Sequence, residues 1–513
     1  MTQSSETGEN QSTADSLATV ASGGTLVAAS KVVSLAFGFL TQLVMARLLT
    51  EAAYGEVVLT LAVVNIGGLF ATLGLDDGVM RELPHHEDTP AKSRGVIRAG
   101  FLTSIVSGSV VALLIYLSAP VLATQIFRDP SLTPLFRIAS IGVPFVVLSN
   151  VAVSLARGAR DARPHAIVNQ LFQPFARLLL IAGLVLLGFE AAGAVAGQMA
   201  AVVLAALLAL YIGYRILPDV RAPSERMYRP LLAFSLPLVL VQGMGFLNSN
   251  LDIYMVGYFM QSPDIGVYNI ALQLGNLLTA VVATMGFLLP PVMTRLHEQG
   301  QTQEMQRTYQ VITKWLVVLG LPVFVVLFFA PEFVIGTLFG GDYARGSTAL
   351  RILLLGKLFA ILMGLNGMAL IALGENRVVS YIMFCQVLVN VGVNVLLIPV
   401  YGIEGAAVAI MASIIIGDVL GVAVLYRRYG VHPFTRPAIS PVLAICALGG
   451  ISYLGFDAAG IPTPAVVGLV GIAYLPIIAK LVPEPEDEEL LQLVEERTGR
   501  EFSRLRGAIR AVR

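Results

Sequence analysis

The sequence is poor in charge and rich in apolar residues. Of its 513 residues only 13% are charged and 56% are hydrophobic, whereas about 25% of a typical soluble domain is charged. A soluble fold of this length cannot hide so much apolar surface, so the composition predicts a membrane protein. The formal net charge is zero, which argues against a nucleic-acid partner held by overall electrostatic attraction.

Cysteine and histidine, which build many metal and catalytic sites, are scarce. The chain has two cysteines and five histidines. Cys385 and Cys446 both fall in apolar segments, which favours small core residues over a disulfide or a metal pair. No Gly-x-x-x-x-Gly-Lys-Ser/Thr nucleotide-binding loop is present, so the chain is not expected to hydrolyse ATP by itself. We therefore predict neither an enzyme nor a resident cofactor, and only a possible coupling ion, Na+ or H+.

What the chain has in abundance is long apolar segments. Fourteen of them approach or exceed the roughly 20 residues that a helix needs to cross about 30 Å of hydrocarbon. Backbone polar groups inside a bilayer must be satisfied within each segment, and the alternation typical of β-barrel strands is not seen. We therefore predict an all-α polytopic membrane protein. The predicted spans are 23–48, 56–76, 99–125, 133–156, 164–187, 191–213, 230–258, 264–290, 308–330, 347–372, 378–399, 402–426, 438–455 and 462–482.

The basic residues alternate between the two sides of these spans. Loops after even-numbered spans, counted with their flanking turns, and the C-terminal end from Lys480 onward together hold 25 of the 33 lysines and arginines. Loops after odd-numbered spans hold only Arg128 and Arg345. By the positive-inside rule, both termini are predicted to be cytoplasmic, in a multi-pass protein of the cell membrane. Residues 1–20 contain no basic residue and no apolar run, so the first span is expected to act as its own targeting signal.

An internal repeat is readable in the sequence. Residues 188–192 (GFEAA) match residues 402–406 (GIEGA) at an offset of 214, and Arg137 matches Arg351 at the same offset. Each half holds six spans, an even number, so the halves are expected to be parallel repeats with a substrate site between them. The predicted organisation is a cytoplasmic N-terminal tail (1–22), an N-terminal six-helix lobe (23–213), a cytoplasmic linker (214–229), a C-terminal six-helix lobe (230–426), two additional helices (438–482) and a cytoplasmic C-terminal tail (483–513).

Six basic residues remain outside these two groups of loops and lie within the predicted spans: Lys31, Arg47, Arg137, Arg177, Arg351 and Lys357. A lysine or arginine at the bilayer centre costs about 2.5–3.5 kcal/mol even on a lenient scale. Three of them, Arg47, Arg137 and Arg351, lie near helix ends and could instead extend to the headgroups, and Lys31 could pair with Asp252. A hydrated cavity that receives an anion would remove the penalty. Because arginine matches phosphate oxygens bidentately, a diphosphate is the favoured guest.

Four spans also carry polar residues three or four positions apart, hence on one helix face. These are Gln386, Asn390 and Asn394; Asn269, Gln273 and Asn276; Gln170, Gln173 and Arg177; and Asn248 and Asp252. Such amides can simply bond packed helices to each other, but together with the cations they favour a wetted cavity. Asp252 is either a counter-ion or a proton or sodium site, and Asp418 is expected to make a local hydrogen bond. The predicted substrate-binding residues are Lys31, Arg47, Arg137, Arg177, Asn248, Gln273, Arg351, Lys357, Gln386 and Asn390.

Four segments resemble a known family. Residues 46–55 (ARLLTEAAYG), 291–307, 338–343 (LFGGDY) and 390–407 are similar to segments of polysaccharide-transport flippases of the Wzx type, and the likeness extends from about residue 22 to 480. The resemblance implies the multidrug/oligosaccharidyl-lipid/polysaccharide exporter superfamily. It also implies a MATE-like transporter fold with two six-helix bundles, two extra helices and a cationic central cavity.

The resemblance and the residues together give three hypotheses. The favoured one is a flippase that moves a polyprenyl-(di)phosphate-linked oligosaccharide outward, with membrane lipid and glycan-assembly enzymes as partners. A cation-coupled multidrug antiporter of the sister branch is the alternative, although it would favour acids over bases inside the membrane. The third is a lipid scaffold without transport, which would need no hydrated path.

Overall fold

The computed structural model describes residues 30–86, 88–161, 163–216, 223–286, 289–458 and 464–481. The predicted tails 1–22 and 483–513 lie outside these ranges. Within them the chain forms helices and no β-strand, and ten helical stretches are long and apolar enough to cross a membrane. The predicted all-α polytopic fold is therefore confirmed, while the count of fourteen spans stays a prediction.

The chain divides into two compact units. Unit 1 comprises Met1–Phe246 with Met260–Gly266, and unit 2 comprises Leu247–Phe259 with Val267–Arg513. The division falls inside two long helices, so each of these contributes residues to both units.

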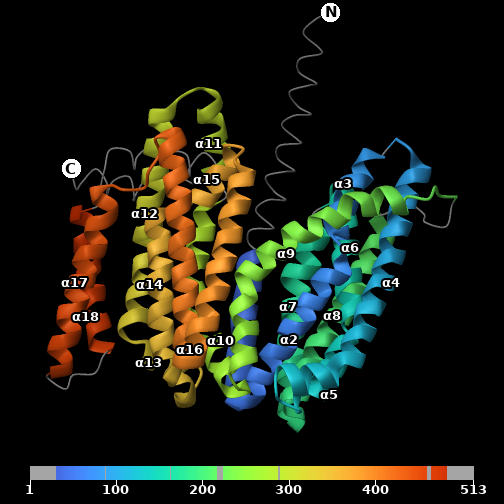
Figure 1. Ribbon diagram of the computed structural model, residues 1–513, viewed down its shortest axis with the longest axis horizontal. Helices are drawn as coiled ribbons and strands as arrows, with labels where there is room; N and C mark the ends of the chain where they lie inside the picture. Colours follow the sequence, from blue (N-terminus) through green and yellow to red (C-terminus); the bar gives the residue numbers. More distant parts are fainter. Residues whose placement is uncertain are drawn as a thin grey trace, which may run out of the picture. The chain divides into compact units, whose positions relative to one another are not determined.

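Unit 1 is a set of packed helices (Figure 1). Its elements are the helix Ser30–Leu48, α2 (Glu51–Thr72), α3 (Leu75–His85), α4 (Pro90–Val121), η1 (Leu122–Ile126), α5 (Leu132–Ser140), α6 (Val143–Gly158), η2 (His165–Phe172), α7 (Gln173–Leu184), η3 (Val185–Phe189), α8 (Glu190–Ile216) and the first part of α9 (Tyr228–Phe259). Val79 of α3, Val96 of α4 and Leu155 of α6 are buried together with Leu231 of α9. This core attaches the first part of α9 to unit 1.

Local sequence explains where α2 begins and ends. The Thr50 side chain accepts a hydrogen bond from the Ala53 backbone N–H at 3.2 Å, which satisfies one of the free donors at the helix start. Leu73 and Gly74 follow the helix in the left-handed region, with φ of 53° and 67°. This left-handed pair stops α2 and lets α3 start as a separate helix.

Unit 2 contains the remaining helices (Figure 1). They are the last part of α9, α10 (Ser262–Gly286), α11 (Leu289–Glu298), α12 (Thr302–Phe329), α13 (Pro331–Leu338), η4 (Gly341–Gly346), α14 (Ser347–Met363), α15 (Asn366–Ala372), α16 (Asn376–Tyr429), α17 (Arg436–Ala458) and α18 (Pro464–Leu481). The pair α17 and α18 packs on α12, and the Tyr474 hydroxyl donates a hydrogen bond to the Val318 carbonyl. The two additional helices therefore belong to unit 2.

Each unit contains a helical hairpin at the position where the sequence repeats. The 54 residues of α16 would extend about 80 Å as one straight helix, far beyond the hydrocarbon thickness. Gly402, with φ 58° and ψ −132°, interrupts it, and a Cβ on Gly405 would lie 2.5 Å from the Leu397 carbonyl oxygen. In unit 1, Gly188 has φ 90°, and a Cβ on Gly197 would lie 2.8 Å from the Ile181 backbone nitrogen. Both turns therefore fold the chain back onto itself, where only glycine fits the close approach.

Candidate functional site

The predicted cation of unit 2 with the best-defined neutral hydrogen-bond partners is the half-buried Lys357 on α14. Its Nζ donates hydrogen bonds to Asn276 Oδ1 at 3.0 Å and to Thr279 Oγ1 at 3.1 Å, both on α10. The stem passes over Gly275, where an added Cβ would lie 3.2 Å from Lys357 Cε. A glycine, an asparagine and a threonine on one helix thus hold the ammonium group in place and leave one of its three donors for another group.

Asp252 on α9 is the carboxylate that attracts Lys357. The residue is 3% exposed, and the two charges interact electrostatically. Its Oδ2 and the hydroxyl of the neighbouring Tyr268 both lack a hydrogen-bond partner of normal geometry among the described residues. If Asp252 is a counter-ion, Lys357 is therefore its partner within unit 2. The alternative pair with Lys31 would join residues of different units and stays a prediction.

The amides of α16 and its neighbours divide into two groups. Asn394 Nδ2 donates to Asn390 Oδ1 at 2.8 Å, and both residues are buried, which is how amides bond within packed helices. Asn248 Nδ2 instead contacts Gln386 Oε1 at 3.5 Å, a long contact that joins α9 to α16. On α10 the half-buried Gln273 is not the residue that bonds Lys357.

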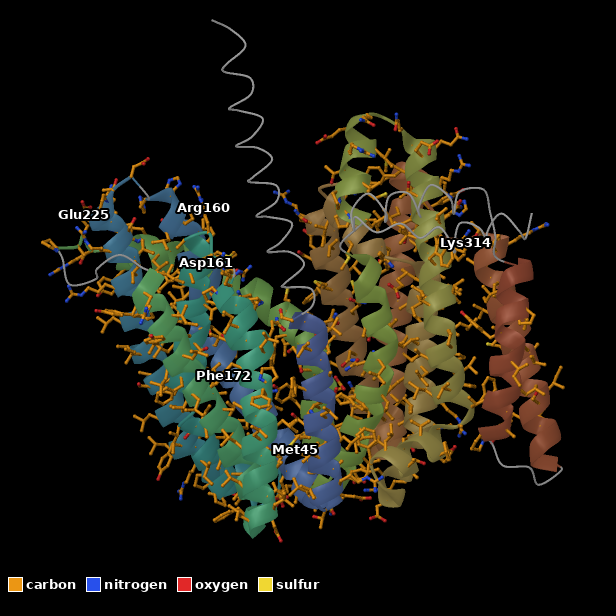
Figure 2. All side chains as sticks on the ribbon, turned by 180° about the vertical axis from the view of Figure 1, so that it is seen from behind. Met45, Arg160, Asp161, Phe172, Glu225 and Lys314 are labelled. Atoms are coloured by element: carbon orange, nitrogen blue, oxygen red, sulfur yellow. The ribbon has the colours of Figure 1, made fainter. Side chains whose placement is uncertain are left out.

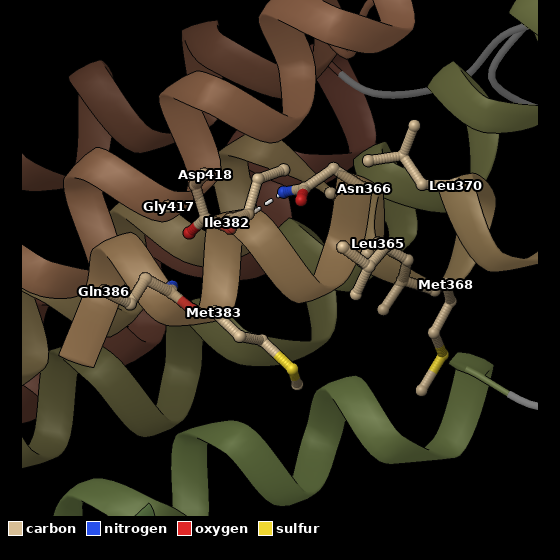
Figure 3. Close-up of a pocket in the computed structure, with 12 residues that line it drawn as sticks. Leu365, Asn366, Met368, Leu370, Ile382, Met383, Gln386, Gly417 and Asp418 are labelled. Atoms are coloured by element: carbon tan, nitrogen blue, oxygen red, sulfur yellow. Dashed lines mark hydrogen bonds between the residues drawn. The ribbon is translucent and has the colours of Figure 1, made fainter. Parts of the chain in front are cut away.

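Gln386 also lines a pocket of about 240 Å³ within unit 2 (Figure 3). Asn366 and Asp418 lie in its wall, and Asn366 Nδ2 donates to Asp418 Oδ1 at 2.8 Å. The expected hydrogen bond of Asp418 is present, and its partner is near in space but belongs to α15, 52 residues away in the sequence.

The two repeat-related arginines are held by groups of their own units. Arg351 makes two contacts with the Glu332 carboxylate, at 3.0 and 3.1 Å, and donates from Nε to the Phe328 carbonyl at 3.2 Å. The Arg137 guanidinium lies over the Tyr116 ring, 5.2 Å from its centroid, a cation–π contact. This geometry favours a role for Arg351 at its helix end and not in substrate binding, because its guanidinium nitrogens already bond Glu332 and the Phe328 carbonyl.

Arg177 differs from these arginines. It lies on α7, and its Nε is buried without a hydrogen-bond partner in the part of the chain that the structure describes. A buried donor without an acceptor is costly, so this side chain is the cation of unit 1 with most to gain from an anion.

Upstream of Arg177 the chain is a π-helix, and this changes which residues share a face. His165 Nε2 and Gln170 Nε2 lie 3.2 Å apart within η2, which ends at Phe172 (Figure 2). Residues five apart meet in a π-helix but not in an α-helix. The predicted stripe of Gln170, Gln173 and Arg177 assumed a regular period and omitted His165.

The two remaining predicted cations lie on the helix Ser30–Leu48. Lys31 is exposed in its first described turn, within electrostatic range of His165. Arg47 is exposed near its end, next to the buried Ala46.

One buried cation was assigned wrongly from the sequence. Lys314 was counted with the loop residues that set the orientation, but it lies in the interior of α12 and is 0% exposed (Figure 2). Its position well inside the predicted span 308–330 is the signal that could have found it. Removing Lys314 from the cytoplasmic count leaves the large excess of basic residues on that side unchanged.

The described part of the chain contains no cluster of side chains that could hold a metal ion. Among these residues no three His, Cys, Asp or Glu side chains come together.

Comparison with known proteins adds the family. Residues 44–347 match the model of a family described as "Polysaccharide biosynthesis protein", which is more than half of the chain. The protein belongs to this family. The predicted resemblance is thereby confirmed.

A curated relative and two solved structures illustrate the similarity. The succinoglycan biosynthesis transport protein of Rhizobium meliloti is 25% identical over 64% of this chain and 64% of its own length. The structure of a lipid II flippase in an inward closed conformation has a TM-score of 0.67 at 14% identity, covering 88% of this chain and 98% of that one. An inward-facing MATE-family multidrug resistance transporter has a TM-score of 0.65 at 16% identity, covering 77% and 94%.

These similarities have different weight. The two structures, both under 25% identical, establish the fold, and the predicted MATE-like transporter fold is confirmed. The chain spans between 37% and 64% of the length of the first three curated relatives that it matches.

Proposed function

We propose that this protein is a flippase for a polyprenyl-(di)phosphate-linked oligosaccharide. It would move the substrate across the cytoplasmic membrane by alternating access, for assembly of a surface polysaccharide or a protein-linked glycan. The family match over residues 44–347 carries the proposal, and the relative named as a succinoglycan biosynthesis transport protein supports it. The polyprenyl tail would stay in the lipid, and the glycan-assembly enzymes that supply and consume the substrate would be partners.

The cations give the proposal its chemistry. Arg177 has a buried Nε without an acceptor among the described residues, and Lys357 is held on α10 by two neutral oxygen atoms. Phosphate oxygens would complete both groups, because charge-assisted hydrogen bonds are the strongest available to them. We propose Arg177 and Lys357 as phosphate-binding residues, with Asn248 and Gln386 nearer to sugar hydroxyls. Lys31, Arg47, Arg137, Gln273, Arg351 and the buried Asn390 remain weaker candidates.

The positive-inside pattern supports a proposed orientation with both termini in the cytoplasm. A substrate made by cytoplasmic enzymes would then be taken up at the side where most basic loops lie.

The multidrug antiporter is a weaker proposal. The MATE-family structure shares the fold, but a fold hosts many functions. A cavity for cationic drugs would favour acids, whereas the membrane segments of this chain carry more bases than acids.

Reconstitution tests the proposal directly. The purified full chain is placed in proteoliposomes with a fluorescently labelled polyprenyl-diphosphate oligosaccharide, and outward movement is scored by accessibility to a membrane-impermeant quencher. We expect translocation by the wild type, a loss of at least about tenfold in Lys357→Ala, and no loss in the matched Lys92→Ala control. Efflux of a cationic dye with no movement of the lipid-linked glycan would contradict the proposal and favour the antiporter.

A further inference from the structure

The pocket of unit 2 that Asn366, Gln386 and Asp418 line, here the Asp418 pocket, contains none of the residues that contact Lys357 (Figure 3). The rest of its wall is glycine and apolar side chains such as Met368 and Met383, and none of its lining residues is basic. Its volume of about 240 Å³ is enough for several waters, since a water occupies about 30 Å³ in the liquid.

Among the described residues the Asp418 carboxylate accepts one amide hydrogen bond, and no basic side chain lines its pocket. The Asn366 amide is its hydrogen-bond partner, and the titratable group that faces it from α12 is the Tyr309 hydroxyl, which itself donates to the Met363 carbonyl at 2.7 Å. The segment of α15 contains no titratable residue.

Three basic residues of α14 and α16 are engaged elsewhere, and the other two of α16, Arg377 and Arg427, lie near its ends. On α14, Lys357 bonds α10 and Arg351 bonds Glu332. On α16, Arg428 bonds Glu375. An ionised Asp418 would therefore rest on a single neutral amide.

The depth of Asp418 makes that arrangement costly. Gln386 lies ten residues after the start of α16 at Asn376, and Asp418 lies eleven residues before its end at Tyr429. Both ends of α16 are at one side of unit 2, because Glu375 accepts hydrogen bonds from Arg428 and Tyr429. At 1.5 Å per residue the carboxyl is about 15 Å from that side, roughly half of the hydrocarbon thickness. An ionisable group at such a depth is expected to serve a function.

We propose that Asp418 is a proton-binding site that exchanges its proton with water in the Asp418 pocket. The step is the association of one proton with one carboxylate oxygen, and it needs no other reactant. A proton fits better than an alkali ion, because such an ion needs several oxygen ligands and only three lining residues bring polar side chains. That the proton drives transport rests on the proposed function, whereas the site itself does not.

Two connections give the protonation a structural consequence. The seven-residue α15 follows a break at Gly364, which has φ 72° and ψ −161°, and the Asn366–Asp418 bond adds a polar link between this short helix and the α16 helix on which it packs. Neutralising the carboxylate weakens that bond. Gln386, in the same pocket wall, contacts Asn248 on α9, one helical turn from Asp252. The protonation state of Asp418 thus bears on α15, and the wall of the same pocket is connected to α9 through Gln386.

Infrared titration of the purified full chain tests the site. We expect a protonated-carboxyl band that titrates with bulk pH in the wild type, is lost in Asp418→Asn and is kept in the matched Asp88→Asn control, whose side chain is exposed. In Asn366→Ala the band should persist with its midpoint moved to higher pH, because the ionised form loses its donor. The Asn366→Ala result keeps the test valid if Asp418→Asn does not fold. A spectrum unchanged in Asp418→Asn, or a midpoint unchanged in Asn366→Ala, would overturn the proposal.

Proteoliposomes with an imposed pH gradient test the coupling. A gradient should accelerate translocation of the labelled polyprenyl-diphosphate oligosaccharide about tenfold in the wild type and Asp88→Asn, and not at all in Asp418→Asn. An acceleration retained by Asp418→Asn, or a response to a sodium gradient that Asp418→Asn loses, would overturn the proton role. If the wild type moves no substrate while the infrared band titrates, the proposed flippase function fails and the proton site stands.

Discussion

The two units satisfy their buried cations in different ways. In unit 1 the Nε of Arg177 has no hydrogen-bond partner among the described residues. In unit 2 the Nζ of Lys357 bonds Asn276 and Thr279 and is attracted by Asp252. Unit 1 therefore has a guanidinium donor without an acceptor among its described residues, and unit 2 has an ammonium group whose own unit supplies acceptors and a carboxylate. We expect the units to differ accordingly in what each cation contributes to substrate binding and to stability.

The largest effect should come from Arg177. Arg177→Gln is expected to lower translocation of the lipid-linked oligosaccharide about 100-fold, since a charge-assisted hydrogen bond contributes about 2–3 kcal/mol and tenfold corresponds to about 1.4 kcal/mol. The thermal unfolding temperature should stay level or rise, because an unsatisfied buried donor is removed. The Lys357→Gln variant should lose less transport than Arg177→Gln, and its unfolding temperature should fall below that of the wild type.

Arg98→Gln, which changes an exposed arginine of α4, is the control for both. If Arg177→Gln loses stability and keeps its transport rate, Arg177 is a structural residue and the contrast between the units is wrong.

The hairpin turns are the next comparison. In unit 2 Gly402 adopts φ 58° and ψ −132°, and in unit 1 Glu190 adopts nearly the same angles, 43° and −132°. Gly402→Ala is expected to destabilise unit 2 by about 1–3 kcal/mol, because a Cβ is disfavoured there. Glu190→Ala should be close to neutral, because the wild type already carries a side chain in that conformation. Guanidinium or thermal unfolding in detergent measures both, and equal losses would show that the turns are not strained in this way.

These turns also show what the sequence could predict. The match of GFEAA and GIEGA located both reversals of the chain, since the same short motif must bend in both halves. It could not show that Glu190 would take the strained angles. Spacing placed Asn276 on the face of α10 that carries polar residues, but only the packing of α14 selected Asn276 and Thr279, and not Gln273, as partners of Lys357.

Two further misses have physical causes. His165 meets Gln170 because η2 is a π-helix, and an assumed period of 3.6 residues separates them. The Arg351–Glu332 pair depends on how α13 turns back onto α14, which no periodicity reveals. The fold class follows from composition and length alone, whereas the site depends on contacts between helices.

The repeat-related arginines give a smaller effect. Arg351→Ala should destabilise unit 2 by about 1 kcal/mol, because its carboxylate partner is partly exposed and such pairs are weak. Arg137→Ala, which loses one cation–π contact, should cost about 0.5–1 kcal/mol. A double-mutant cycle of Arg351 with Glu332 measures the coupling, and both single variants should transport at the wild-type rate. If Arg351→Ala loses transport while its unfolding free energy falls by only about 1 kcal/mol, Arg351 contacts the substrate.

The smallest effect concerns a pH-dependent contact between the two ends of α16 in unit 2. Glu375, in the turn before α16, accepts hydrogen bonds from Arg428 Nη1 at 2.5 Å and from the Tyr429 hydroxyl at 2.9 Å. These bonds, that of Arg428 first, lower the pKa of the Glu375 carboxyl below its usual value.

A depressed folded-state pKa adds stability above the unfolded value, about 4.3, and the contribution is lost as the pH falls through the lower folded value. The unfolding temperature of the wild type should therefore slightly exceed that of Glu375→Gln at pH 7, and the difference should vanish as the pH falls below about 4. Glu304→Gln, which changes an exposed glutamate of α12, should show no such convergence. A difference between wild type and Glu375→Gln that is independent of pH would mean that the amide loses packing and not an ionic bond.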